Sequence, residues 1–318
     1  MGIKNNITID DSPKSFNQSH KKVKRKKNFL PYLFILPTVI LISFWLYKPL
    51  FQNLSYMFYD WNMLPNTEPQ FVGLENFTKL LSHKDFAVAI NNTIFYIVIM
   101  LPFSIIIPIY LANMTHELSK GYRNFYRALL FIPMIVAPVA ISIIFQWLLH
   151  PTNGLVNHIL IQLGLLDNGI QFFTNEFWAK FMIALIAGWK MIGFSTLIFS
   201  ASIGSIDESY YESARLDGAS KRRIFYTITV PLVSPTIMLL LTMSILFANE
   251  WTFAFIDVLT SGGPYGTSTN FYYIMYDYAF KDMNVGLSAA ASLMFLVIFG
   301  IIAIILQIIT KKVTFYDN

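Results

Sequence analysis

The stretch MNVGLSAAASLMFLVIFGIIAIILQIIT, residues 283–310, contains no charged side chain and lies between Asp282 and Lys311. A helix needs about 20 mostly apolar residues to cross the hydrocarbon core of a bilayer, so this stretch can span a membrane. The whole chain of 318 residues has the same character, because 55% of its residues are hydrophobic and only 13% are charged. Soluble domains carry about 25% charged residues. The composition therefore predicts an all-α membrane protein.

Five further apolar stretches of similar length occur along the chain. Only the one that begins near residue 181 carries an ionisable group near its middle, Lys190. Together with the first stretch they predict six transmembrane helices, at about residues 29–50, 90–113, 128–149, 181–203, 232–256 and 286–310. Residues 29–310 are thus expected to form one transmembrane domain.

The lysine and arginine residues are distributed unevenly between the loops. Seventeen of the 23 lie in four segments that six helices would place on one side of the membrane: 1–28, 116–127, 207–223 and 311–318. Basic loops stay in the cytoplasm, so both termini are predicted to be cytoplasmic. The polar, lysine-rich segment 1–28 is expected to be a disordered tail and 311–318 a second, short tail.

Several kinds of function are disfavoured by composition. The chain has no cysteine, its five histidines show no metal-ligand spacing, and no Ser-His-Asp arrangement is recognisable. We therefore expect no metal site, no catalytic residues and no enzymatic activity. The basic run before the first span is explained by anionic lipid at the membrane surface, so no nucleic-acid partner is expected.

The most informative cytoplasmic segment, residues 206–235, reads IDESYYESARLDGASKRRIFYTITVPLVSP. Asp207 is placed to cap a helix, and Gly218 is placed to end that helix in the left-handed conformation before a second helix begins near Ser220. The pattern predicts a helix, a tight turn and a helix. Tyr211 and Leu216 are expected to project as knobs that dock into a cleft of another protein.

This segment resembles the "EAA" motif of permease subunits in binding-protein-dependent ABC importers. The matching residues are Glu212, Ser213 and Ala214, followed by Gly218, Ile228 and Pro231. The longer form YYESARLDGAS, with Asp217 before the glycine, is similar to that of permeases for oligosaccharides and related polyols, such as the maltose and glycerol-3-phosphate systems. Other matches to the family are FVGLENF at 71–77, LTSGGP at 259–264, YDYAF at 276–280 and GLSAAASLMF at 286–295.

The resemblance implies an assembly and a mechanism. In such importers two homologous permeases pair, two ATPase subunits dock beneath them, and an external solute-binding protein delivers the solute. This chain has no phosphate-binding loop of the G-x-x-x-x-G-K-[ST] type, so ATP and magnesium are expected in the partner subunits only. By resemblance, Glu212, Ser213, Ala214, Asp217 and Gly218 couple the ATPases to the permease. The location implied is the cell membrane of a prokaryote.

Polar residues inside the predicted spans mark a candidate solute path, since a charge facing lipid costs several kcal/mol. The candidates are Lys190, Asn249, Glu250, Trp251 and Asp257. Lys190 is expected either to contact the solute or to pair with Glu250 as a structural bridge; the sequence leaves both open.

Gln146 and Trp147 in the third predicted span form a second candidate site, which ranks after the residues of the fifth span. The expected solute is an oligosaccharide, with a monosaccharide second and glycerol-3-phosphate or a related polyol phosphate third. A secondary transporter and an intramembrane enzyme are the competing classes. Neither an internal repeat nor a catalytic cluster supports them.

Overall fold

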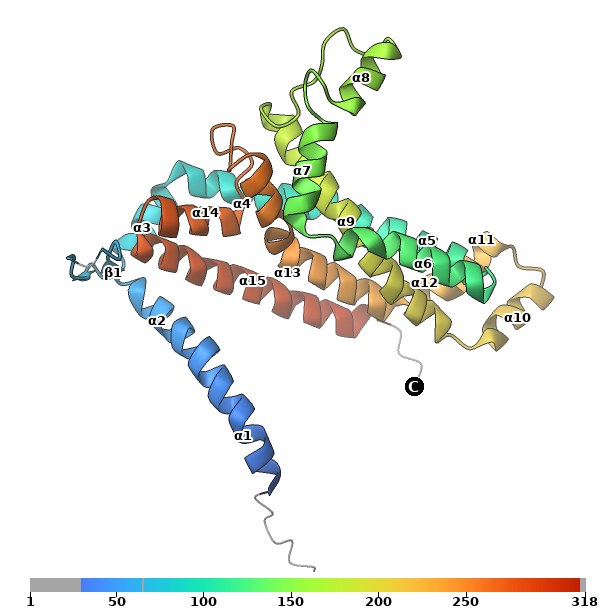
Figure 1. Ribbon diagram of the computed structural model, residues 1–318. Helices are drawn as coiled ribbons and strands as arrows, with labels where there is room; N and C mark the ends of the chain where they lie inside the picture. The colour runs from blue at the N-terminus through green and yellow to red at the C-terminus, as the bar shows by residue number, and fades with distance from the viewer. Residues whose placement is uncertain (1–29, 65, 315–318) are drawn as a thin grey trace, which may run out of the picture. The chain divides into compact units, whose positions relative to one another are not determined.

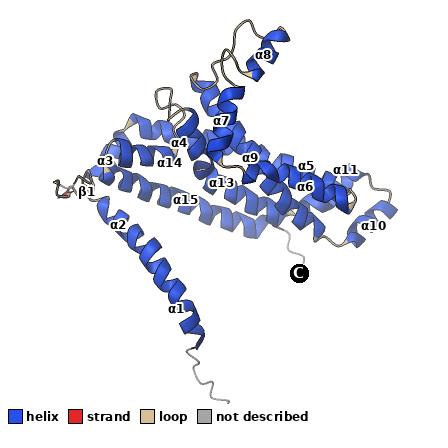
Figure 2. Cartoon of the chain, in the orientation of Figure 1, coloured by secondary structure: helices blue, strands red, loops and turns tan. Residues whose placement is uncertain are grey.

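The computed structural model describes residues 30–64 and 66–314, so the predicted tail 1–28 and residues 315–318 lie outside the described residues. Helices make up most of the described chain (Figure 2). The prediction of an all-α membrane protein is confirmed. The chain divides into two units, residues 1–50 and residues 51–318.

The first unit contains helix α1 (Leu30–Ile42), a π-helical segment (Ser43–Tyr47) and the beginning of α2 (Lys48–Tyr56). These segments run on without a break and form one apolar helix that is long enough to cross a bilayer. The side chains of residues 32–50 are exposed. This helix falls on the first predicted span, residues 29–50.

The second unit is a bundle of helices with a small two-stranded sheet, β1 (Tyr59–Asp60) and β2 (Gln70–Phe71) (Figure 1). Its helices, in chain order, are α3 (Glu75–Ser82), α4 (Lys84–Leu101), α5 (Ile107–His116), α6 (Lys120–Ile135), α7 (Pro138–Leu148), α8 (Leu155–Gln162), α9 (Glu176–Gly204), α10 (Glu208–Leu216), α11 (Lys221–Ile224), α12 (Val230–Leu232), α13 (Ser234–Leu259), α14 (Phe271–Tyr276) and α15 (Val285–Val313). Two π-helical segments, Pro102–Ile106 and Phe225–Thr229, join neighbouring helices, and a third, Asp277–Lys281, extends α14.

Four continuous helices of this unit are long and apolar enough to cross a bilayer: Lys84–His116, α9, α13 and α15. They overlap the predicted spans at 90–113, 181–203, 232–256 and 286–310. The remaining predicted span, 128–149, differs from expectation because it consists of two helices, α6 and α7, bent by 92°. Figure 1 shows α7 and the loop that carries α8 projecting away from the bundle.

The bend between α6 and α7 has a local cause. The pyrrolidine ring of Pro138 disfavours the helical conformation at the residue before it and removes one backbone donor. Ala137 is accordingly extended, with ψ of 135°, and Val136 at the end of α6 has the same ψ. The chain therefore leaves the direction of α6 at these two residues and starts a new helix at Pro138.

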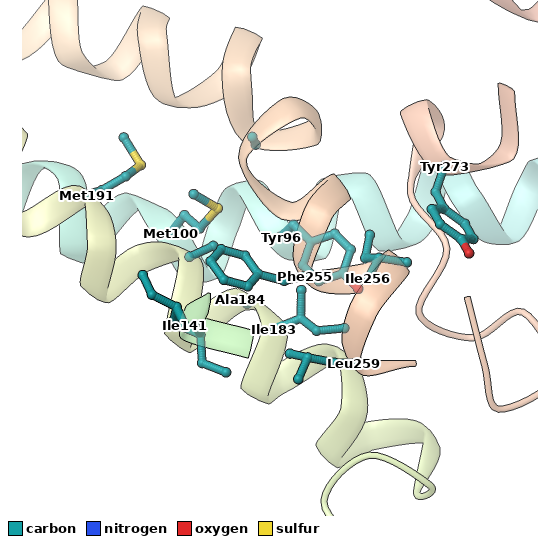
Figure 3. Close-up of a cluster of buried hydrophobic side chains, with 13 residues drawn as sticks. Tyr96, Met100, Ile141, Ile183, Ala184, Met191, Phe255, Ile256, Leu259 and Tyr273 are labelled. Carbon is teal, nitrogen blue, oxygen red and sulfur yellow. The ribbon is translucent and has the colours of Figure 1, made fainter. Parts of the chain in front are cut away.

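The largest buried cluster joins α4, α7, α9, α13 and α14 (Figure 3). Tyr96 and Phe255 are completely buried in it, and the Tyr96 hydroxyl donates to the backbone carbonyl of Ser268 at 2.6 Å. Close backbone contact tightens the neighbouring α6 and α9 pair. A Cβ atom on Gly193 would lie only 2.0 Å from the carbonyl oxygen of Leu130, so glycine alone permits this approach.

Candidate coupling hairpin and solute path

The predicted helix, turn and helix lies at one end of the bundle as α10 and α11 (Figure 1). The Asp207 carboxylate caps α10 by accepting from the Ser209 amide at 2.9 Å, and this hydrogen bond lowers the pKa of Asp207. The Ser220 hydroxyl caps α11 by accepting from the Arg223 amide at 3.3 Å. Both starting points of the hairpin therefore lie where the sequence placed them.

Gly218 occupies the turn with φ of +73°. Its amide donates to the carbonyl of Arg215 at 3.1 Å, and the next amide, of Ala219, donates to the carbonyl of Ala214 at 3.0 Å. This pair of bonds is a Schellman motif, whose left-handed position favours glycine. A side chain at Gly218 would meet no atom within 4 Å, so the requirement for glycine is conformational.

The outer surface of the hairpin presents the residues of the motif. Glu212, Ser213, Asp217 and Gly218 are exposed, and Ala214 is half-buried. Leu216 is the most prominent apolar residue of this surface, with 88% of its area exposed. These residues lie together on the part of the hairpin that a partner can reach.

The prediction that Tyr211 projects as a knob is wrong. The side chain is 7% exposed, and its hydroxyl lies 3.3 Å from that of Thr229. A second link to the bundle is the ion pair between Lys221 on α11 and Glu117 at the end of α5, at 2.6 Å. Tyr211 thus anchors the hairpin to the bundle. Of the two predicted knobs, only Leu216 projects.

Lys190 lies fourteen residues from either end of α9, which places it about 21 Å from each end. Its ammonium group donates to the carbonyl of Val136 at 2.6 Å. Among the ion pairs of residues 30–64 and 66–314, none joins Lys190 to Glu250, so the expected structural pair is absent from this conformation. The reason is the bend: the extended backbone at residues 136–137 turns a carbonyl toward α9, and Lys190 satisfies it.

Asn249 lies in the interior with 1% of its surface exposed. Its side-chain oxygen accepts from the Thr93 hydroxyl at 2.9 Å and from the Phe271 amide at 3.2 Å. Its backbone carbonyl accepts from the Asn270 side chain at 2.8 Å. In this structure Asn249 therefore positions α14 against α4 and α13.

Asn249→Ala is expected to destabilise the chain by roughly 1–3 kcal/mol, because the buried Thr93 hydroxyl loses its acceptor, while the Phe271 amide keeps the Thr93 oxygen at 3.1 Å. The thermal midpoint of the purified, detergent-solubilised chain should fall by several degrees, as followed by fluorescence-detected gel filtration. The control is Asn168→Ala, at an exposed loop position. Equal midpoints for the two variants would contradict the positioning role.

The other candidates on α13 have different surroundings. Glu250 and Asp257 are exposed, and the Tyr273 hydroxyl donates to the Asp257 carboxylate at 3.3 Å. Trp251 is half-buried and packs edge to face on Phe194 of α9, with ring centroids 6.1 Å apart. The structure thus brings Trp251 to the α9 side of α13 and leaves Glu250 on the outer surface of the bundle.

Sequence reasoning missed the polar network around Asn249. Hydrogen bonds connect Asn249 to Thr93 and to Asn270. Thr93 and Asn249 are more than 150 positions apart in the sequence. No local sequence pattern predicts such a network. Its signal in the sequence is that Thr93, Asn249 and Asn270 are uncharged polar residues within apolar helices or next to them. In the described part of the chain there is also no group of three or more His, Cys, Asp or Glu residues that could hold a metal ion.

Comparison with known proteins places this geometry in context. Residues 93–315 match the family described as "Binding-protein-dependent transport system inner membrane component". The chain is similar to the sn-glycerol-3-phosphate transport system permease protein UgpA of Yersinia pestis, with 30% identity over 91% of this chain and 96% of that protein. The UgpA protein of Escherichia coli is 32% identical over 86% of this chain and 92% of its own length.

A solved structure shares the fold. The chain is similar to a subunit of a bacterial ABC transporter involved in the import of the acidic polysaccharide alginate, with a TM-score of 0.80 and 28% identity. The match covers 90% of this chain and 96% of that one. The chain is also similar, with the same TM-score and identity, to a chain in a structure of a bacterial alginate ABC transporter in complex with an alginate pentasaccharide-bound periplasmic protein. The family match, the relatives and the shared fold agree, and the chain belongs to the inner membrane components of binding-protein-dependent transport systems.

Proposed function

We propose that this chain is one of two homologous permease subunits of an ATP-driven importer for a carbohydrate, an oligosaccharide in the first place. An external binding protein delivers the solute, and two ATPase subunits bind ATP and magnesium. The observation that carries the proposal is the exposed hairpin α10–α11. Its surface combines an apolar knob, Leu216, with the carboxylate of Glu212, while buried contacts hold its base to the bundle.

The hairpin is suited to transmit motion. The Schellman turn at Gly218 fixes the angle between its two helices. Tyr211 connects the hairpin to Thr229 in the segment before α13, and Lys221 connects it to Glu117 at the end of α5. A displacement of Leu216 by a docked ATPase therefore moves the ends of the spanning helices with it. Helix shifts of this kind convert a cavity from one orientation to the other.

The solute path is proposed along the face of α13 that carries Glu250. This residue lies nine positions before the end of α13, about 14 Å along the helix axis, and it is exposed. A carboxylate at this depth is too costly against lipid, so it faces the cavity or the second permease. Trp251 supplies an aromatic surface between α13 and α9. It packs there on Phe194, which lies four residues after Lys190 on α9.

Glycerol-3-phosphate is the second candidate solute. Two observations favour it: the UgpA relatives carry that solute in their names, and Lys190 places an ammonium group in the middle of α9. A phosphate would compete with the Val136 carbonyl for that ammonium group. Uptake of both solute classes by the assembled importer, each with its cognate binding protein, separates the two possibilities.

Glu212→Arg should weaken coupling to the ATPases, because it reverses a charge on the docking surface. We expect ATP hydrolysis stimulated by solute-loaded binding protein to fall at least about tenfold, as one charged contact is worth about 1.4 kcal/mol or more. The measurement uses the reconstituted importer in lipid nanodiscs. The control is Glu68→Arg, at an exposed position in the loop between β1 and β2. Unchanged stimulation in Glu212→Arg would refute the docking role.

The topology gives an independent prediction. Single cysteines at Ser82, Asn168 and Tyr265 should react with an impermeant thiol reagent added outside intact cells, whereas cysteines at Ser119 and Lys312 should react only after lysis. All five positions are exposed, and the native chain has no cysteine to give background. The physical reason is the sorting of basic residues to the cytoplasmic side. The opposite labelling pattern would invert the topology.

A further inference from the structure

A pocket of about 490 Å³ lies where the end of α7, the two arms of the loop that carries α8 and the end of α13 meet. It is separate from Lys190 and Glu250, neither of which lines it. Its polar and aromatic lining residues include Gln146, Trp147, His150, Asn153, Gln171 and Phe172. Pockets of this size hold small ligands.

Hydrogen bonds hold the walls of the pocket in place. Asn157 is completely buried, and its side-chain amide donates to the carbonyls of His150 and Ile170 at 3.1 and 3.0 Å while accepting from the Ile170 amide at 2.8 Å. This one residue ties together the two arms of the loop. The Gln146 side chain donates to the carbonyl of Val258 at 3.2 Å and so fixes α7 to the end of α13.

The lining has a consistent chemistry. Trp147 is 78% exposed and presents an indole ring, and the buried ring of Phe172, packed edge to face on Trp178, forms a firm wall. Within the described residues the side-chain amide of Asn153 makes no hydrogen bond, and Gln171 uses only its oxygen, accepting from Thr174 at 2.9 Å. Free amide donors and acceptors beside an aromatic ring suit a ligand with both hydroxyls and C–H faces.

No aspartate, glutamate, lysine or arginine lines this pocket. A phosphate or carboxylate ligand would find no lysine or arginine there, and desolvating such an anion is costly. We propose that the pocket binds one unit of a neutral sugar chain, stacked on Trp147 and hydrogen bonded by Asn153 and Gln171. Its role as a first station for the solute outside the membrane rests on the proposed function; its binding of sugar does not.

Cysteine protection tests the proposal on the importer assembled in nanodiscs, without nucleotide. Thr174→Cys, at an exposed position of the pocket wall that the proposal does not use to bind the sugar, is labelled with a maleimide in the presence of maltotetraose, cellotetraose or xylotetraose, and separately with glycerol-3-phosphate or an alginate tetrasaccharide. We expect at least one neutral sugar to slow labelling about fivefold at four-fifths occupancy, by mass action. The anionic compounds should not slow it. Gln162→Cys on α8 is the control, outside the pocket, and its rate should not change.

A second variant separates binding from indirect effects. Protection should disappear in Trp147→Ala and persist in Trp147→Phe, which keeps a ring. The proposal is overturned if none of the three neutral sugars protects Thr174→Cys, if protection survives Trp147→Ala, or if the anionic compounds protect equally. Normal protection together with intact coupling in a Gly218 variant would instead count against the proposed coupling function alone.

Discussion

Replacing Gly218 by valine is expected to abolish transport while the permease still assembles in the membrane. The turn requires φ of +73°, which a β-branched residue adopts only at a cost of about 1–2 kcal/mol or more. The hairpin relieves this strain by changing the angle between α10 and α11, and Leu216 and Glu212 then no longer present one docking surface. Solute uptake by proteoliposomes should fall more than about tenfold, with ATP hydrolysis no longer stimulated by loaded binding protein.

Two controls isolate the backbone conformation as the cause. Gly204→Val makes the same substitution at the end of α9, where φ is not positive and an added Cβ atom meets nothing within 4 Å, so transport should stay normal. Gly218→Asn should retain part of the activity, because asparagine adopts the left-handed conformation more readily. Normal uptake by Gly218→Val would show that the turn does not transmit motion.

Lys190→Met is expected to impair transport about tenfold or more, because a hydrogen bond from a charged donor contributes roughly 1.5–3 kcal/mol. The substitution removes the bond that holds the bend at Val136 against α9 and also removes a positive charge from the proposed solute path. Lys190→Arg keeps both charge and donors and should retain more activity. Initial rates of uptake, compared at equal amounts of assembled complex, provide the measurement.

The exchange of Lys190 and Glu250 distinguishes the bend from an ion pair. The double variant Lys190→Glu, Glu250→Lys should transport no better than Lys190→Glu alone, since the partner of Lys190 is a backbone carbonyl and not the carboxylate. Restoration of transport in the double variant would show that the two side chains meet in a conformation of the working importer.

The elements that the sequence located well are those specified locally. Asp207 and Ser220 cap adjacent helices and Gly218 ends one of them, and each needs only its immediate neighbours to do so. The apolar spans are likewise readable because every one of their residues contributes to the same signal. The caps and turn of the hairpin and five of the six apolar helices could therefore be located from the sequence, whereas the bend within residues 128–149 was missed.

The solute path could not be predicted in the same way, because its geometry depends on contacts between distant segments. Asn249 and Glu250 are neighbours in sequence, yet one is buried and the other exposed, since successive residues of a helix lie about 100° apart. The partner of Lys190 depends on the bend 54 positions earlier. That bend did have a local signal, Pro138, which the length and apolar character of residues 128–149 concealed.

The uninterrupted length of α9 has a mechanical consequence. Its 29 residues form a rod of about 43 Å that joins the loop beside the pocket of Gln146 and Trp147 to the hairpin α10–α11, for which we propose the coupling role. If the rod pivots about its centre, a tilt of about 10° moves each end by roughly 4 Å, while Lys190, at the fulcrum, hardly moves. Such a tilt moves the loops at both ends of α9, while the hydrogen bond between Lys190 and Val136 near the middle of the helix stays in place.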